Sequence, residues 1–418
     1  MSSLETPGRF PKNTLKKRGY SPFSSVYSFT RSPFPVSQWS SKWLSYSIYD
    51  GIVITSKEME RLTPEVQRAI FAYVRGGGVL LILGTWRIPS RLAYFHTEKK
   101  EGFDIYEIGF GKCLISSKSR LNDFQNDQLE YLRDQFKDSG FPWNKMLSAR
   151  RISRKFPIIK SSNIPLRLLF FFLLFFSIAS GPLAFWWLSL KNKRTLIFFI
   201  IPPASLITSV VILLSALLLE GTTPYKRSIT LTFLDQISHQ ASTIGWLGYY
   251  SPVTIGEGIQ FSDKVELTPF LSWKGGQPKE MDWSNGQTLG AGWIISRVPS
   301  YFLIRINDGR WERLQIRRDR YGNLKVLNGL GSKILSLYLA DDKGVIYFAS
   351  SIPPGKSSFL RKTWSFTRKK PEKIREIFKV IGYSKGIEVC DRHPKIYLLP
   401  NTYIAKLSSN PFLEGEGI

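Results

Sequence analysis

The sequence predicts a multidomain membrane protein in which an α/β domain and a mainly-β, sandwich-like domain flank a two-helix transmembrane hairpin. Three observations lead to this prediction. An apolar stretch at 168–219 is interrupted only by the polar turn Lys191–Arg194. Before it, a strand, a helix and a second strand follow one another, and after it short strand-like segments alternate with turn residues.

The apolar stretch contains two predicted transmembrane helices, 168–190 and 195–219. Neither half carries a formal charge, and each is as long as the roughly 20 apolar residues that cross a bilayer. The turn between them is too short to form a domain. The simplest interpretation is a hairpin that returns the chain to its starting side.

The interior of the hairpin predicts an anchor and not a transport pathway. Gly181–Pro182 and Pro202–Pro203 are predicted kinks, because proline removes a backbone donor within a helix. A pathway for ions or polar substrates requires ionisable or amide side chains within the spans. The polar side chains here are hydroxyls, such as those of Ser180 and Thr208.

The chain is strongly basic, with a formal net charge of +26. Nucleic acid, anionic lipid headgroups or an acidic protein are the partner classes that such a charge attracts. Because the chain carries a predicted hairpin, we assign the charge to a lipid bilayer with anionic headgroups and not to nucleic acid. The predicted membrane-surface cluster lies in a linker, 147–167, and in the hairpin turn: Arg150, Arg151, Arg154, Lys155, Lys160, Lys191, Lys193 and Arg194.

Residues 1–47 are predicted to be a flexible basic arm without the apolar core of a signal peptide. The α/β domain follows at 48–146. The apolar run Ile52–Ile54 predicts a buried strand, and Thr63 predicts the N-cap of a helix. Gly76–Gly78 predicts the end of that helix, before a second strand at Val79–Leu83, so the unit is βαβ with a parallel sheet.

The Gly triplet does not match a phosphate loop, since it precedes a strand instead of following one. Phe103–Ile108 and Lys112–Ser116 predict two strands of a hairpin. A helix is expected at 122–136. A loop is expected around His96.

The mainly-β domain is predicted at 226–405. Turn sequences such as Asn307–Gly309 separate its short strands. One helix is expected near 371–381, followed by a last strand at 396–399. The remaining strands are expected at 293–296, 301–306, 324–327, 334–339 and 345–349.

The two cysteines, Cys113 and Cys390, have no partners at the spacing of metal ligands. This spacing predicts neither a disulfide framework nor a zinc site. We also predict no other metal site, no cofactor and no catalytic residue.

The order of these parts resembles a family of uncharacterised bacterial inner-membrane proteins, whose soluble part is similar to a piece of the class I glutamine-amidotransferase fold, a flavodoxin-like α/β architecture. The matching segments are Tyr49–Ile54, Tyr73–Gly84, Gly181–Leu183, Leu231–Asp235 and Tyr250–Pro252. The resemblance implies a two-pass protein of the cell inner membrane, with membrane or envelope proteins as partners.

Two functional hypotheses follow. The first is a non-catalytic, membrane-anchored scaffold. The alternative is a membrane-tethered hydrolase or amidotransferase relative that uses Cys113, but this cysteine lacks the glycines of a nucleophile elbow. The side of the membrane stays open, because the positive-inside rule places the soluble domains in the cytoplasm whereas the resemblance implies that they lie outside.

Overall fold

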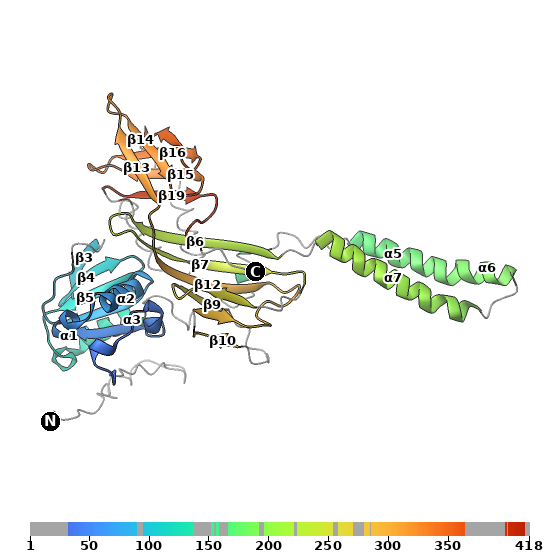
Figure 1. Ribbon diagram of the computed structural model, residues 1–418, viewed down its shortest axis with the longest axis horizontal. Coiled ribbons are helices and arrows are strands. Elements are labelled where there is room, and N and C mark those ends of the chain that lie inside the picture. Colours follow the sequence, from blue (N-terminus) through green and yellow to red (C-terminus); the bar gives the residue numbers. More distant parts are fainter. Residues whose placement is uncertain are drawn as a thin grey trace.

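The computed structural model contains an α/β lobe, two β lobes and two long apolar helices that extend away from the lobes (Figure 1). The structure describes residues 32–89, 95–137, 152–153, 156–158, 166–191, 196–220, 224–253, 258–270, 280–284, 286–363, 398 and 400–413.

The α/β lobe contains a mixed sheet with the strand order β1-β2-β5-β4-β3. β1, β2 and β5 are parallel, and β4 and β3 are antiparallel additions. Every residue of β2 is buried, as expected for a strand covered on both faces. The strands are β1 (Gly51–Thr55), β2 (Val79–Leu83), β3 (Phe95–Lys100), β4 (Phe103–Ile108) and β5 (Gly111–Ser116).

Helices cover both faces of this sheet. α1 (Ser56–Arg61) and α2 (Pro64–Arg75) pack on one face, and α3 (Asn126–Lys137) packs on the other. α2 begins after its Thr63 cap and ends at Gly76, which confirms the predicted βαβ unit. α3 begins later than the predicted residue 122. The prediction of a loop around His96 is wrong, because residues Phe95–Lys100 form β3.

The first β lobe contains two sheets that share one core. Its large sheet has the order β6-β7-β12-β9, and its small sheet has the order β10-β11-β8. Leu247 and Phe302 from the large sheet and Phe261 from the small sheet belong to the same buried cluster. The strands are β6 (Tyr225–Asp235), β7 (Gln240–Tyr250), β8 (Ile259–Phe261), β9 (Val265–Pro269), β10 (Met281–Asp282), β11 (Gln287–Leu289) and β12 (Ser300–Gly309).

The second β lobe has its own core, which includes Val326, Ile334 and Leu337. Its sheets have the orders β13-β14-β17 and β18-β16-β15-β19. The strands are β13 (Arg313–Arg318), β14 (Leu324–Gly329), β15 (Ile334–Ala340), β16 (Ile346–Ile352), β17 (Ser357–Phe359), β18 (Arg361–Lys362) and β19 (Tyr403–Leu407).

These two cores divide the predicted mainly-β domain 226–405 into two lobes. The predicted strand at 293–296 is wrong, because these residues form a bend and one isolated bridge, Ser251 to Ser296. The predicted helix near 371–381 lies outside the described residues, as does most of the strand expected at 396–399.

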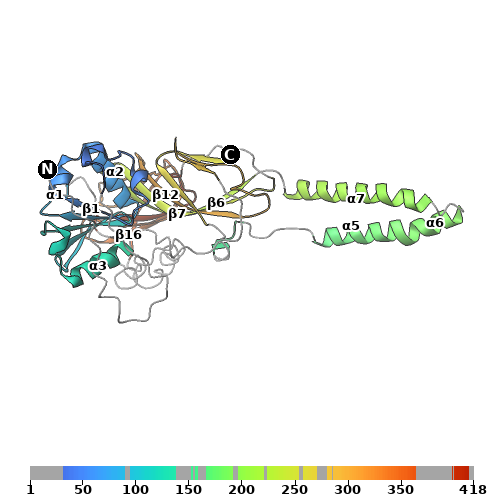
Figure 2. The same cartoon turned by 90° about the horizontal axis from the view of Figure 1, so that it is seen from below.

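The apolar helices lie side by side (Figure 2). One consists of α5 (Leu166–Ile178), the π-helical segment η6 (Ala179–Leu183) and α6 (Ala184–Leu190), and the other is α7 (Ile197–Glu220). Among the described residues, one helical stretch, Phe170–Leu190, is long and apolar enough to cross a membrane, and the apolar stretch Ile197–Ile212 of α7 is shorter.

Candidate membrane anchor and lobe junction

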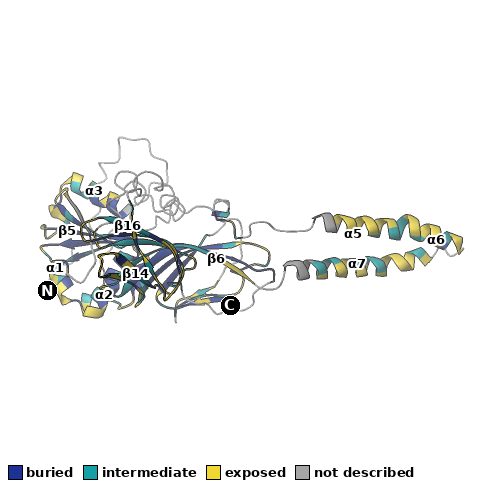
Figure 3. Ribbon diagram, turned by 90° about the horizontal axis from the view of Figure 1, so that it is seen from above, coloured by how far each residue is buried: buried dark blue, intermediate teal, exposed yellow. Residues whose placement is uncertain are grey.

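Most described residues of the two apolar helices are exposed or half-buried, whereas the buried residues lie mainly in the lobes (Figure 3). Phe198 and Phe199 of α7 are 75% and 76% exposed. Apolar surface of this extent on one element marks contact with a membrane or another protein. The helices therefore form the first candidate functional site.

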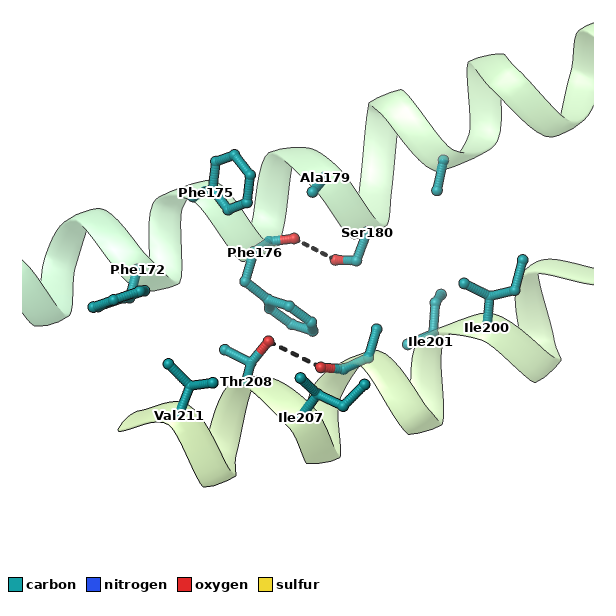
Figure 4. Close-up of a pocket in the computed structure, with 12 residues that line it drawn as sticks. Phe172, Phe175, Phe176, Ala179, Ser180, Ile200, Ile201, Ile207, Thr208 and Val211 are labelled. Carbon is teal, nitrogen blue, oxygen red and sulfur yellow. Dashed lines mark hydrogen bonds between the residues drawn. The ribbon is translucent and has the colours of Figure 1, made fainter. Parts of the chain in front are cut away.

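A cleft of about 380 Å³ lies between the two helices. Two of its polar groups are satisfied within their own helices, as Figure 4 shows: Ser180 Oγ donates to the carbonyl oxygen of Phe176 at 2.6 Å, and Thr208 Oγ1 donates to that of Ala204 at 2.9 Å. The other lining residues are apolar: Phe172, Phe175, Phe176, Ala179, Ala184, Ile200, Ile201, Ala204, Ile207 and Val211. The hydroxyl donors of Ser180 and Thr208 are therefore both used within their own helices.

The predicted kink residues lie in both helices. Gly181 and Pro182 are part of the π-helical segment η6. A widened turn is a common response to proline, which has no N–H to donate. Pro202 and Pro203 lie inside α7, which continues through them, and Ser205 Oγ donates to the Pro202 carbonyl oxygen at 2.8 Å.

One member of the predicted basic cluster, Lys191, is exposed, and its ammonium lies 4.1 Å from the ring centroid of Trp187. This contact holds a cation beside an aromatic residue at the end of α6, a combination typical of the membrane–water interface. The other members lie outside the described residues: Arg150, Arg151, Arg154, Lys155, Lys160, Lys193 and Arg194.

Part of the linker before α5 is docked on the first β lobe. Ile152 and Phe156 are buried against Trp246 and Tyr301. Arg227 of β6 lies over the Phe156 ring, 5.0 Å from its centroid, and donates to the Pro157 carbonyl oxygen. The sequence prediction for this linker rests on its charge alone. The spacing of Ile152 and Phe156 by four residues is the signal that could have revealed the docking.

A buried ion pair within the first β lobe lies at the contact with the α/β lobe and forms the second candidate site. Arg305 Nη2 on β12 lies 2.5 Å from Glu266 Oε2 on β9, and the two side chains are 6% and 4% exposed. The same guanidinium donates to the carbonyl oxygens of Gly76 and Ser47, each at 3.4 Å. Since Gly76 ends α2, Arg305 also meets the negative end of that helix dipole.

Apolar and polar contacts surround this pair. Phe110, between β4 and β5, is buried against Ile244, and its ring centroid is 4.6 Å from that of Phe233. Trp43 Nε1 donates to the Lys264 carbonyl oxygen at 3.2 Å. Burial lowers the pKa of Arg75 to about 10, although the charge of Asp235 opposes this shift. Because the Gly76 carbonyl oxygen accepts from Arg305, the Gly turn after α2 contacts the first β lobe in addition to ending the helix.

Cys113 is fully buried in β5. Burial raises the pKa of its thiol well above the usual range, so the nucleophilic thiolate is suppressed at neutral pH. In the sheet, Tyr106 pairs with Cys113 on one side and with His96 on the other. Two strand spacings of about 4.8 Å thus separate His96 from Cys113. This geometry opposes the hypothesis of a Cys113 nucleophile.

We expect Cys113 in the folded protein to resist a small thiol probe between pH 7 and pH 9. Labelling of a Cys390→Ser variant, followed by mass spectrometry, measures Cys113 alone. The same probe in denaturant is the control and should label Cys113 fully. Fast labelling of the native protein near pH 7 would restore the enzyme hypothesis.

In the part of the chain that the structure describes, no cluster of three His, Cys, Asp or Glu residues could hold a metal ion. No family model, curated protein or solved structure matches the chain. The resemblance to bacterial inner-membrane proteins therefore stays a prediction.

Proposed function

We propose that the protein is a two-pass membrane protein whose lobes form a non-catalytic scaffold for other proteins of the membrane or envelope. The exposed apolar surface of α5, α6 and α7 carries this proposal. A bilayer would cover that surface, and the hydroxyl groups in the cleft already bond within their helices. The basic residues of the linker and the hairpin turn would lie near anionic headgroups.

Two observations support the scaffold role. Arg305, which pairs with Glu266 inside the first β lobe, also donates to the carbonyl oxygens of Gly76 and Ser47 and so links this lobe to the α/β lobe. β6 is eleven residues long and stands at the edge of its sheet in the described strand order. Edge strands and loops are common binding surfaces for extended segments of a partner.

We expect the full-length chain to stay with membranes after a wash with alkaline carbonate, because apolar helices inserted in a bilayer are not released by high pH. The measurement is the fraction that sediments with the membranes. A variant that lacks 166–220 is the comparison and should be released. Release of the full-length chain would contradict the anchor.

A further inference from the structure

One end of the first β lobe is held next to the apolar helices. α7 ends at Glu220 and β6 begins at Tyr225, so a short connection joins them. Tyr225 pairs with Tyr250, and Ser300, where β12 begins, pairs with Tyr249. These ends of β6, β7 and β12 therefore lie together, on the side of the lobe that faces α5 and α7 (Figures 1 and 2).

A hydrogen-bonded turn, Ile295–Val298, lies at this end. The Val298 N–H donates to the Ile295 carbonyl oxygen at 3.2 Å, and the Arg297 N–H donates to the Ser251 carbonyl oxygen at 2.7 Å. Arg297 has a φ of 62°, a left-handed conformation that is unfavourable for a residue with a side chain. The surrounding hydrogen bonds hold this turn in its strained form.

The turn presents apolar side chains to the outside. Ile295 and Val298 are each 48% exposed. Tyr225 and Val253, from the neighbouring strand ends, are exposed large hydrophobics as well. We name these four residues the helix-side rim. Lys226 and Arg297, both exposed, lie beside them.

We propose that the helix-side rim inserts into the interfacial layer of the bilayer that the helices span. This inference rests on the proposed membrane anchor. Branched apolar residues, a tyrosine and cations are the combination that favours the boundary between headgroups and acyl chains. The short connection to α7 keeps the rim at the bilayer surface, so lipid is its nearest apolar partner.

Insertion of the helix-side rim would fix the orientation of the first β lobe on the membrane. β6 starts beside the end of α7 and runs away from the apolar helices, roughly along their long axis (Figures 1 and 2). Its eleven residues span about 36 Å. With the rim in the interface, the strands stand upright on the membrane. The turn that joins β6 to β7, which contains Ile237, then lies far from the lipid.

The test uses the full chain, with Cys390 replaced by Ser, in nanodiscs of phosphatidylcholine and phosphatidylglycerol. Ile295→Cys and Val298→Cys are each labelled with a fluorophore, while the buried Cys113 stays unlabelled. We expect fluorescence to fall when brominated lipids replace ordinary ones. Val253→Cys provides an independent readout on the neighbouring loop.

Two further variants separate the possible outcomes. Ile237→Cys, at a residue that is 88% exposed, is the matched control and should show no quenching. Phe175→Cys on α5 tests the anchor itself. Quenching at Phe175→Cys without quenching at the three rim positions would overturn this inference and leave the anchor intact. An apolar emission shift at the rim without quenching would indicate a protein contact and would also overturn it. No quenching at Phe175→Cys would overturn the anchor and the inference together.

Discussion

Replacing Arg305 by Met is expected to destabilise the protein by about 3–5 kcal/mol, because the variant leaves the carboxylate of Glu266 buried without its charged partner. Arg305 and Glu266 are 6% and 4% exposed, so water cannot replace the lost contact. The variant also removes the donors to Ser47 and Gly76. Urea unfolding of the solubilised chain measures the loss, and the α/β lobe should unfold separately from the first β lobe.

A second substitution and a surface pair are the controls for this prediction. Adding Glu266→Leu to Arg305→Met removes the unpaired charge and should recover part of the stability. Lys264 Nζ lies 2.8 Å from Asp308 Oδ1, but the Lys264 side chain is 52% exposed. Lys264→Ala should therefore change the free energy of unfolding by about 0–1 kcal/mol. If Arg305→Met unfolds at the same urea concentration as the natural protein, the junction does not depend on this pair.

Replacing Gly111 by Ala is expected to destabilise the α/β lobe by about 1–3 kcal/mol or more, because the added methyl group has no room. A Cβ atom there would lie 2.1 Å from the Val74 carbonyl oxygen and 2.2 Å from that of Gly78. Both are backbone atoms, at and just after the end of α2, so they cannot rotate away. Thermal or urea unfolding measures the effect.

Gly309→Ala is the matched control for Gly111→Ala. Its new Cβ would find its nearest neighbour at 3.7 Å, which is ordinary contact. We expect a change of less than about 1 kcal/mol at this position. Equal stability losses for the two variants would show that backbone crowding at Gly111 is not the cause.

Elements with a strong local pattern were predictable. Thr63 and Gly76 cap the two ends of α2 as expected, and the apolar run Val79–Leu83 forms the fully buried β2. The long apolar stretch forms helices that expose their side chains. In each case the signal lies within a few consecutive residues.

Elements with a weak or misleading local pattern were missed. β3 is rich in polar residues, and its backbone is extended because it pairs with β4. Residues 293–296 are apolar enough to suggest a strand, yet they form a bend and one isolated bridge, Ser251 to Ser296. Neighbouring strands, and not the residues themselves, decide both structures.

The apolar helices follow from local composition, since long apolar runs need no partner to be recognised. The junction and the rim depend on the tertiary structure. Arg305 donates to Ser47 and Gly76, which are more than two hundred residues away in sequence. Ile295 becomes part of a rim only because the start of β6, the end of β7 and the start of β12 lie together. Periodicity reports which face of an element is buried, but it does not identify the distant residue against which that face packs.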